Sequence, residues 1–275
     1  MERSLGRRSK DVMSGFATNP VPPPNPGPGG TPGQDPVRLS TERKIMQVKR
    51  RLVREATMAI SMLEAALDAL WTLDRDAAKA VRMSDDRIDM EEVEIEQQCY
   101  EILTLHHPFA RDFRVLTFVL KVNSDLERVA DHACSVAKSI IKIADALGDR
   151  PTPAWPTALV ELGQRVPGMC HELMRAVLDE DVDAARRLVA ADKVIDQLDR
   201  RLFEEAMVMM RPLPGSATRS GDGPDPDLAI GMLVYRIGRE LERVGDLMGA
   251  IAEDVVYLAT GSIIRHEKRR TRLGA

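Results

Sequence analysis

Leu-Glu-Arg-Val-Ala-Asp spans residues 126–131, and a near copy, Leu-Glu-Arg-Val-Gly-Asp, spans residues 241–246, 115 positions later. A second correspondence, at an offset of 107, relates residues 85–95 to residues 192–202 and matches acidic and apolar positions in the same order. The difference between the offsets falls in a loop that carries a Gly/Pro insertion in the second half. The chain is therefore predicted to be a tandem of two three-helix units.

Composition and periodicity favour helices. Aromatic residues make up 4% of the chain and charged residues 30%, whereas strands prefer aromatic and β-branched residues. Apolar residues recur at helical spacing. The expected helices cover about residues 41–70, 74–105, 110–147, 157–178, 181–210 and 227–258. Because short connections make neighbouring helices antiparallel, we expect an all-α fold of two antiparallel three-helix bundles in tandem.

The repeats set the expected domain organisation. Residues 19–36 hold eight of the 17 prolines, so residues 1–40 are predicted to be a disordered Pro/Gly-rich extension, a spacer or a docking segment. The first repeat is expected over residues 41–148 and the second over residues 155–268. A further Pro/Gly/Ser-rich loop covers residues 211–226.

Several classes of protein are disfavoured by the sequence. The net charge of −4 leaves no basic excess for nucleic acid. Three widely spaced cysteines make neither a disulfide framework nor a zinc site. No apolar run approaches the roughly 18 residues of a membrane span, and no signal peptide is visible. No Walker loop, GxSxG or HExxH motif is present, so no catalytic residue is assigned. We expect a soluble, cytoplasmic protein that is not an enzyme.

The stripes that should form the buried core contain acidic side chains. Asp85 and Glu92 interrupt apolar residues at steps of three and four, and Asn123 and Glu127 interrupt the next helix in the same way. The equivalent interruptions of the second half include Asp192, Asp199 and Glu242. An unpaired carboxylate in a helical core is costly, so these positions indicate pairing or a bound ion.

Acidic neighbours one turn further on strengthen the case for an ion. Residues at i and i+4 face the same way, and antiparallel helices would gather such pairs into one small volume that requires a counter-charge. Oxygen ligands of this kind suit divalent or trivalent cations, here Mn, Fe, Zn or Mg. The predicted ligands are Glu92, Glu96, Glu127 and Asp131 in the first half and Asp199, Glu242 and Asp246 in the second.

Two alternatives stay open. Arg128 and Arg243 follow the key glutamates and would neutralise carboxylates in a metal-free helical scaffold. A ferritin-type di-metal oxidase needs Glu-x-x-His pairs, and no histidine here has a glutamate three residues before it. His132 is a weaker candidate for binding metal or accepting a phosphoryl group, since its repeat equivalent is Leu247.

The runs NSDLERVADHACSVAKSI (123–140) and YRIGRELERVGDLMGAIAEDVVYLATG (235–261) resemble the PhoU family of phosphate-signalling regulators. The acidic pattern of residues 85–96, followed by HHPFARDFRVL (106–116), is also similar to this family. The similarity covers about residues 45–262, in order and twice over. It implies two three-helix bundles with pseudo-twofold repetition and metal bound at Glu/Asp-x-x-x-Asp motifs, which here are the seven carboxylates named above.

The resemblance also implies a function. PhoU proteins restrain phosphate uptake and repress the phosphate-starvation response by coupling the phosphate ABC importer to a membrane sensor histidine kinase. The expected partners are therefore this kinase and the importer ATPase, with the membrane reached only through them, and a homodimer is expected. Phe203 departs from the family pattern because it stands where a carboxylate is expected, and Leu247 replaces the usual histidine.

Overall fold

A computed structural model describes residues 36–211 and 225–264 of the chain, and these residues contain seven helices and no strand. The helices are α1 (Pro36–Thr72), α2 (Arg75–Met83), α3 (Asp86–His106), α4 (Arg111–Leu147), α5 (Thr157–Asp179), α6 (Val182–Met209) and α7 (Pro226–Thr260). The all-α prediction is confirmed.

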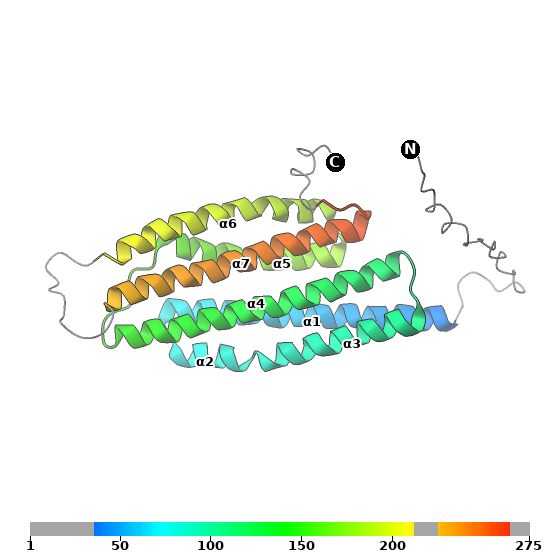
Figure 1. The fold of residues 1–275 in the computed structure, drawn as a ribbon, viewed down its shortest axis with the longest axis horizontal. Helices are drawn as coiled ribbons and strands as arrows, with labels where there is room; N and C mark the ends of the chain where they lie inside the picture. Colours follow the sequence, from blue (N-terminus) through cyan, green and yellow to red (C-terminus); the bar gives the residue numbers. More distant parts are fainter. Residues whose placement is uncertain (1–35, 212–224, 265–275) are drawn as a thin grey trace, which may run out of the picture. The chain divides into compact units, whose positions relative to one another are not determined.

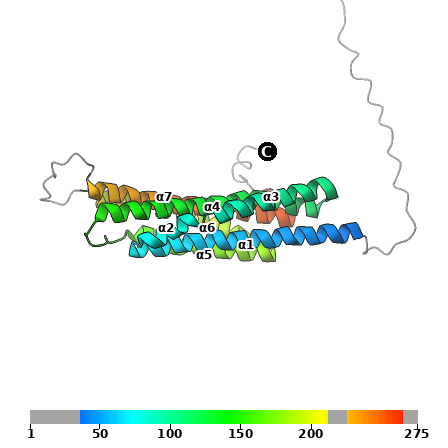
Figure 2. The same cartoon turned by 90° about the horizontal axis from the view of Figure 1, so that it is seen from below.

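Successive helices run antiparallel, with α2 and α3 together acting as one pass (Figure 1). In the view of Figure 1, α6, α7, α4 and the α2–α3 pass form the front of the bundle, and α1 and α5 lie behind them, which Figure 2 shows from below. The last helices of the two repeats, α4 and α7, pack directly against each other. The described residues from Val37 to Ile264 thus belong to one compact unit in which two three-helix repeats share a central helix pair.

Corresponding turns demonstrate the repetition in three dimensions. The residue that follows α1, Leu73, has a left-handed backbone with φ 52°, and the residue that follows α5, Glu180, has one with φ 50°. The next residue caps the following helix in each repeat: Asp74 accepts hydrogen bonds from the first backbone N–H groups of α2, and Asp181 does so for α6. The four residues are related by the same offset of 107 that the sequence contains.

Two predicted helix boundaries need correction. The expected helix over residues 74–105 is two helices, because Ser84, Asp85 and their neighbours form a tighter turn in which Ser84 N–H donates to Val81 and Ile88 N–H to Asp85, three residues back. The first helix begins at Pro36 rather than at residue 41. The predictions for residues 1–35 and for the 212–224 part of the loop lie outside the described residues, as do residues 265–275.

The core runs the length of the helices. Fully buried side chains include Leu63 of α1, Ile95 of α3, Ile140 of α4 and Leu162 of α5. All three cysteines are buried and free, in agreement with the expected absence of a disulfide framework. Among the described helices, none is both long and apolar enough to cross a membrane.

Candidate metal centre

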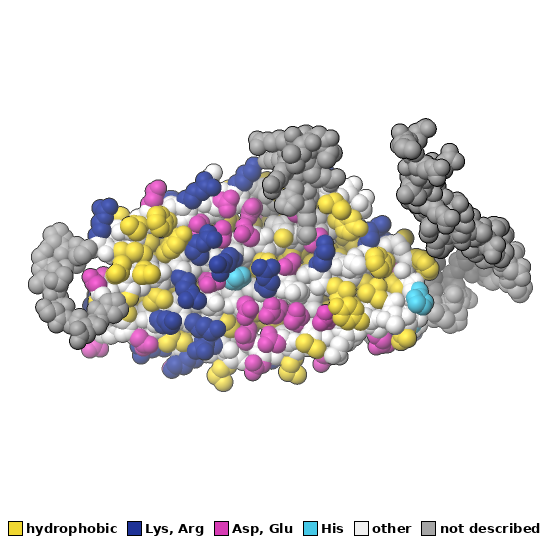
Figure 3. All heavy atoms as spheres, viewed as in Figure 1, with side chains coloured by type: hydrophobic (Ala, Val, Ile, Leu, Met, Phe, Trp, Pro, Cys, Tyr) yellow, Lys and Arg dark blue, Asp and Glu magenta, His cyan; other side chains and the backbone are white. Residues whose placement is uncertain are grey.

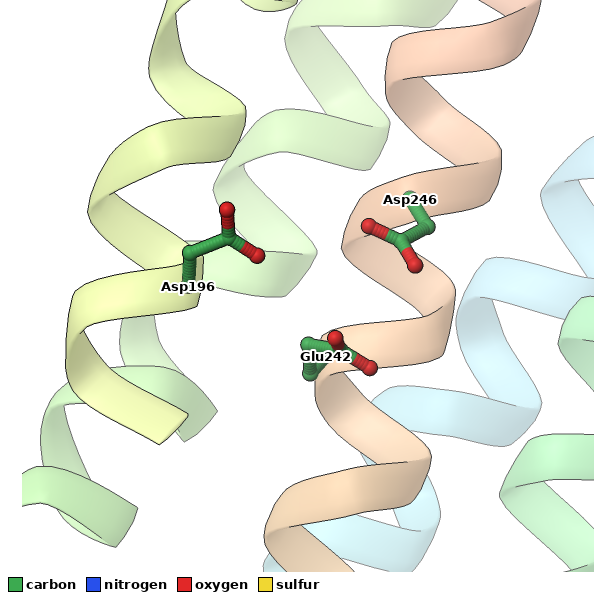
Figure 4. Close-up of side chains that lie close together, drawn as sticks. All are labelled: Asp196, Glu242 and Asp246. Carbon is green, nitrogen blue, oxygen red and sulfur yellow. The ribbon is translucent and has the colours of Figure 1, made fainter. Parts of the chain in front are cut away.

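A close group of carboxylates lies between α6 and α7. Asp196 comes from α6, Glu242 and Asp246 come from α7, and one oxygen atom of each lies within 4.8 Å of the others. In Figure 4, Asp196 points from α6 towards α7, and Glu242 and Asp246 lie one turn apart on α7, with Asp246 pointing towards α6. Glu242 is buried and Asp246 exposed, so the group is open to solvent on one side. Oxygen atoms gathered in this way suit a hard cation.

The electrostatics of this group call for positive charge. Burial, followed by the charge of Asp246, raises the pKa of Glu242. Burial and the charges of Asp246 and Asp196 raise the pKa of Asp192 to about 6. Asp192 Oδ1 and Glu242 Oε2 are buried without a hydrogen-bond partner. Because every donor atom is a carboxylate oxygen and two buried oxygens lack a partner, the residues fit an oxygen-preferring ion such as Mn, Mg or Fe.

Asp199 is not part of this group, although we predicted it as a ligand. Its Oδ2 accepts a hydrogen bond from Arg239 at 3.0 Å, and the same guanidinium lies 3.1 Å from Glu242. Asp196, one turn earlier on α6, occupies the expected place instead. Asp196 lies 107 positions after Asp89, within the acidic pattern that the two repeats share, although it was not predicted as a ligand.

Phe203 lies where a carboxylate was expected. Its ring packs edge-on against Tyr235 of α7, with ring centroids 5.3 Å apart. It is 49% exposed. The second repeat therefore has an exposed aromatic side chain where the first repeat has the carboxylate of Glu96.

The first-repeat seam, between α3 and α4, is more open. Glu92 and Glu127 are half-buried, whereas Glu96 and Asp131 are exposed. Glu96 accepts a hydrogen bond from the Tyr100 hydroxyl at 2.7 Å. Within the described ranges, the α6–α7 group alone brings three candidate ligand atoms within 4.8 Å of one another, so the four predicted ligands of the first repeat do not converge as closely.

The first-repeat carboxyls nevertheless interact strongly. Burial, followed by the charges of Asp131, Glu92, Asp89 and Asp85, raises the pKa of Glu127 to about 7. Burial, followed by Glu96 and Asp89, raises the pKa of Glu92. A cation bound at this half-buried seam would reduce the mutual repulsion of these carboxyls.

Sequence reasoning missed a carboxyl beneath this seam. Glu55 of α1 is 0% exposed, and neither of its oxygen atoms has a hydrogen-bond partner. Burial, followed by the charges of Glu92, Glu91 and Glu127, raises its pKa to about 9. The available signal was its position three residues after Leu52, within the apolar stripe of the helix.

A hydrogen bond between a half-buried histidine and a buried glutamate joins the two repeats. His132 Nδ1 of α4 lies 2.8 Å from Glu240 Oε2 of α7. Burial would raise the pKa of Glu240, but the hydrogen bond from His132 and the charges of Arg243 and Arg236 hold it below its ordinary value. His132 therefore stabilises the contact between α4 and α7, and it is not part of the α6–α7 carboxylate group.

The two arginines that follow the key glutamates pair with carboxylates, as the scaffold alternative expects. Arg128 lies 3.4 Å from Asp125 and Arg243 lies 3.6 Å from Glu240. On the face formed by α6, α7, α4 and α3, acidic side chains gather in two groups with basic side chains between them (Figure 3).

Comparisons with known proteins agree with this architecture. The PhoU domain model matches residues 52–140 and again residues 159–255. The phosphate-specific transport system accessory protein PhoU homolog of Deinococcus radiodurans is 31% identical over 201 residues, which cover 73% of this chain and 87% of that protein. PhoU homolog 1 of Thermotoga maritima is 26% identical over 234 residues, covering 85% and 95%.

Solved structures have the same fold. PhoU from Pseudomonas aeruginosa superposes with a TM-score of 0.71 at 27% identity, covering 80% of this chain and 99% of that one. The phosphate transport system regulatory protein PhoU from Streptococcus pneumoniae, at 23% identity, gives a TM-score of 0.70 over 82% of this chain and 99% of that one.

The fold and the seams define an all-helical tandem-repeat protein with one acidic helix pair in each repeat. The chain belongs to the PhoU family. PhoU proteins are non-enzymatic accessory and regulatory proteins, which agrees with the absence of catalytic motifs from the sequence. The di-metal oxidase alternative is therefore not retained.

Proposed function

We propose that this protein is a negative regulator of phosphate uptake that binds metal and connects the phosphate ABC importer to a sensor histidine kinase. Membership of the PhoU family over both repeats is the observation that supports this most directly. The relatives named as accessory proteins of the phosphate-specific transport system support a role in phosphate transport. In this role, the chain acts through contacts with the importer ATPase and the kinase.

Co-purification tests the adaptor role. The full chain, tagged and expressed in its host, is isolated from phosphate-replete and phosphate-starved cells, and bound proteins are identified. We expect the importer ATPase and a sensor kinase in the replete sample, and we expect deletion of the chain to raise phosphate uptake and starvation-gene expression. Unchanged uptake and expression after deletion would refute a repressing role.

The α6–α7 carboxylate group supports the metal part of the proposal. Glu242 and Asp246 are expected to bind an oxygen-preferring ion, with Asp196 as the third ligand. The variant Glu242→Gln with Asp246→Asn should bind less Mn²⁺ than the parent in equilibrium dialysis. Glu204→Gln, which removes an exposed carboxylate of α6, is the control and should bind as much Mn²⁺ as the parent. Equal Mn²⁺ content in all three proteins would contradict the assignment.

A metal-free scaffold is the competing function, and Arg239 is the observation in its favour. Its guanidinium contacts both Asp199 and Glu242, so the chain itself supplies part of the counter-charge. Such a scaffold would bind no ion and would melt at the same temperature with and without chelator.

Light scattering of the purified chain tests the expected homodimer.

A further inference from the structure

The arginines of the two Leu-Glu-Arg-Val runs belong to a longer charge pattern that occurs in both repeats. Each repeat has a cation, an acid four residues later and an arginine three residues after the acid: Lys121, Asp125 and Arg128 in α4, and their equivalents Arg236, Glu240 and Arg243 in α7. Residues at steps of four and three share one face of a helix. The last helix of each repeat therefore presents two cations on one side.

The cations of this pattern lie at the surface, and the carboxylates that face them lie beneath. All four basic side chains are between 52% and 57% exposed. Their carboxylate partners, which are Asp125, Glu240 and Asp254, are between 6% and 20% exposed. The outer surface of the α4–α7 pair consequently displays positive charge, and the balancing negative charge lies below it.

Glu240 is shared by three basic side chains. His132 Nδ1 lies 2.8 Å from Oε2, and nitrogen atoms of Arg236 and Arg243 each lie 3.6 Å from one of the two carboxylate oxygens. A separation of 3.6 Å is longer than a direct hydrogen bond, and one negative charge does not balance two guanidinium groups. The two arginines therefore suit a further anion from outside, and a guanidinium group binds a carboxylate in a bidentate manner.

The antiparallel packing of α4 and α7 joins the four cations, Lys121, Arg128, Arg236 and Arg243, into one band, which we call the α4–α7 basic band. Lys121 lies 3.2 Å from Asp254, which follows Arg236 by 18 residues on α7, so the band extends about 27 Å along the helix pair. About eight residues of extended chain span the same length. The band is thus too long for one small anion and suits a chain that carries several carboxylates.

Acidic side chains border the α4–α7 basic band on both sides. Figure 3 shows basic side chains in the middle of this face, with acidic side chains above and below them. The α6–α7 carboxylate group lies on one side and the first-repeat seam on the other. A nucleic-acid duplex or an anionic membrane is wide enough to meet these carboxylates together with the band, and the net charge of −4 also disfavours both. A single extended peptide is narrow enough to follow the band alone.

We propose that the α4–α7 basic band is a docking surface for an acidic segment of a partner protein, about eight residues long and rich in Asp and Glu. Arg128 and Arg243, which are equivalent in the two repeats, would each bind one carboxylate of this segment. The inference rests on the adaptor part of the proposed function, and it specifies the surface that the partner contacts and the charge that the partner carries.

The test uses the full chain and a fluorescently labelled peptide of eight glutamates, with binding measured by fluorescence anisotropy in metal-free buffer at low ionic strength. The double variant Arg128→Gln with Arg243→Gln should weaken the affinity about tenfold. Arg175→Gln with Arg187→Gln removes the same charge from exposed positions of α5 and α6 and should change the affinity less than twofold. Equal affinities of the parent and the Arg128/Arg243 variant, or no binding by the parent, would refute the proposal.

A conservative variant and two other probes test the chemistry of binding. Arg128→Lys with Arg243→Lys keeps both charges and should retain the affinity within about threefold, and thermal melting should show that every variant is folded. A loss as large as that of the glutamine variant would mean that charge does not carry the binding. Tighter binding of duplex DNA or phosphatidylserine vesicles than of the peptide would contradict the proposed occupant.

An experiment in cells separates this inference from the proposed function. If deletion of the chain raises phosphate uptake but the Arg128/Arg243 glutamine variant still represses uptake and co-purifies with the importer ATPase and the kinase, the regulatory function stands and the docking surface is refuted. Loss of both partners from this variant, with both retained by the Arg175/Arg187 control, supports the docking surface. If deletion changes nothing, the proposed function fails, and the peptide titration still decides whether the band binds acidic segments.

Discussion

Three glycines of α7 provide a graded test of how closely α6 and α7 pack. A Cβ atom built at Gly238 would lie 1.9 Å from Cδ2 of Leu202, and one built at Gly245 would lie 3.0 Å from Cγ2 of Ile195. At Gly249 the nearest neighbouring atom is 3.8 Å away, an ordinary contact. Alanine at these positions should therefore have opposite effects on stability.

The magnitudes follow from two opposing contributions. Alanine in a helix interior gains about 1 kcal/mol over glycine at each position. At Gly238 this gain is outweighed by about 2–3 kcal/mol of overpacking, because the added Cβ would meet Leu202, a fully buried side chain in a close-packed interior. Gly249→Ala should raise the free energy of unfolding by about 1 kcal/mol, Gly245→Ala should leave it nearly unchanged, and Gly238→Ala should lower it by roughly 1–2 kcal/mol.

Urea denaturation in chelator, followed by circular dichroism, measures these differences without a contribution from bound metal. Thermal melting should reproduce the order, at about 2–4 °C for each kcal/mol in a domain of this size. Gly249→Ala serves as the matched control, because it makes the same chemical change on the same helix. If Gly238→Ala were as stable as Gly249→Ala, the close approach of Leu202 to α7 would be wrong.

Three further predictions concern charge and capping. In chelator, the free energy of unfolding should fall as the pH rises from 4.5 towards 7, because the folded chain keeps a proton on Glu127, whose pKa is raised to about 7, while the unfolded chain has released it. The loss attributable to Glu127 is on the order of 1–2 kcal/mol after solvent screening. In urea denaturation at several pH values, Glu127→Gln should therefore reduce the slope of the free energy of unfolding against pH. An unchanged slope would contradict the assignment. His132→Leu leaves the buried Glu240 carboxylate with two arginines at 3.6 Å and should lower the free energy of unfolding by about 2 kcal/mol in the same assay. Adding Glu240→Leu should recover part of this loss, and strictly additive losses would argue against the pairing. Asp181→Ala removes the N-cap of α6 and should lower stability by about 1 kcal/mol, whereas an unchanged midpoint would mean that this cap contributes nothing.

Much of the fold could be predicted from the sequence, because the helices and their repetition follow from local sequence patterns. Helical periodicity and the offset of 107 between the repeats can be read directly along the chain, and the helices that they predict are present. The break at Ser84 was missed, since residues on both sides of it keep helical spacing and the interruption is a short tightening of the same turn.

The candidate site was only partly predictable. Glu242 and Asp246 converge as expected because both lie on one helix at i and i+4. The third member depends on how α6 is rotated against α7, and this rotation brings Asp196 into the group and turns Asp199 to Arg239. Phe203 could be identified from the repeat alignment, but its packing on Tyr235 could not.

The sequence alone determined that the chain is helical, duplicated and acidic in its seams, because those properties depend on spacing along single helices. The tertiary structure decided which carboxylates meet, which pair with arginine, and that Glu55 is enclosed without a partner. These outcomes depend on the rotation and separation of whole helices, which many distant packing contacts set together and which no local pattern specifies.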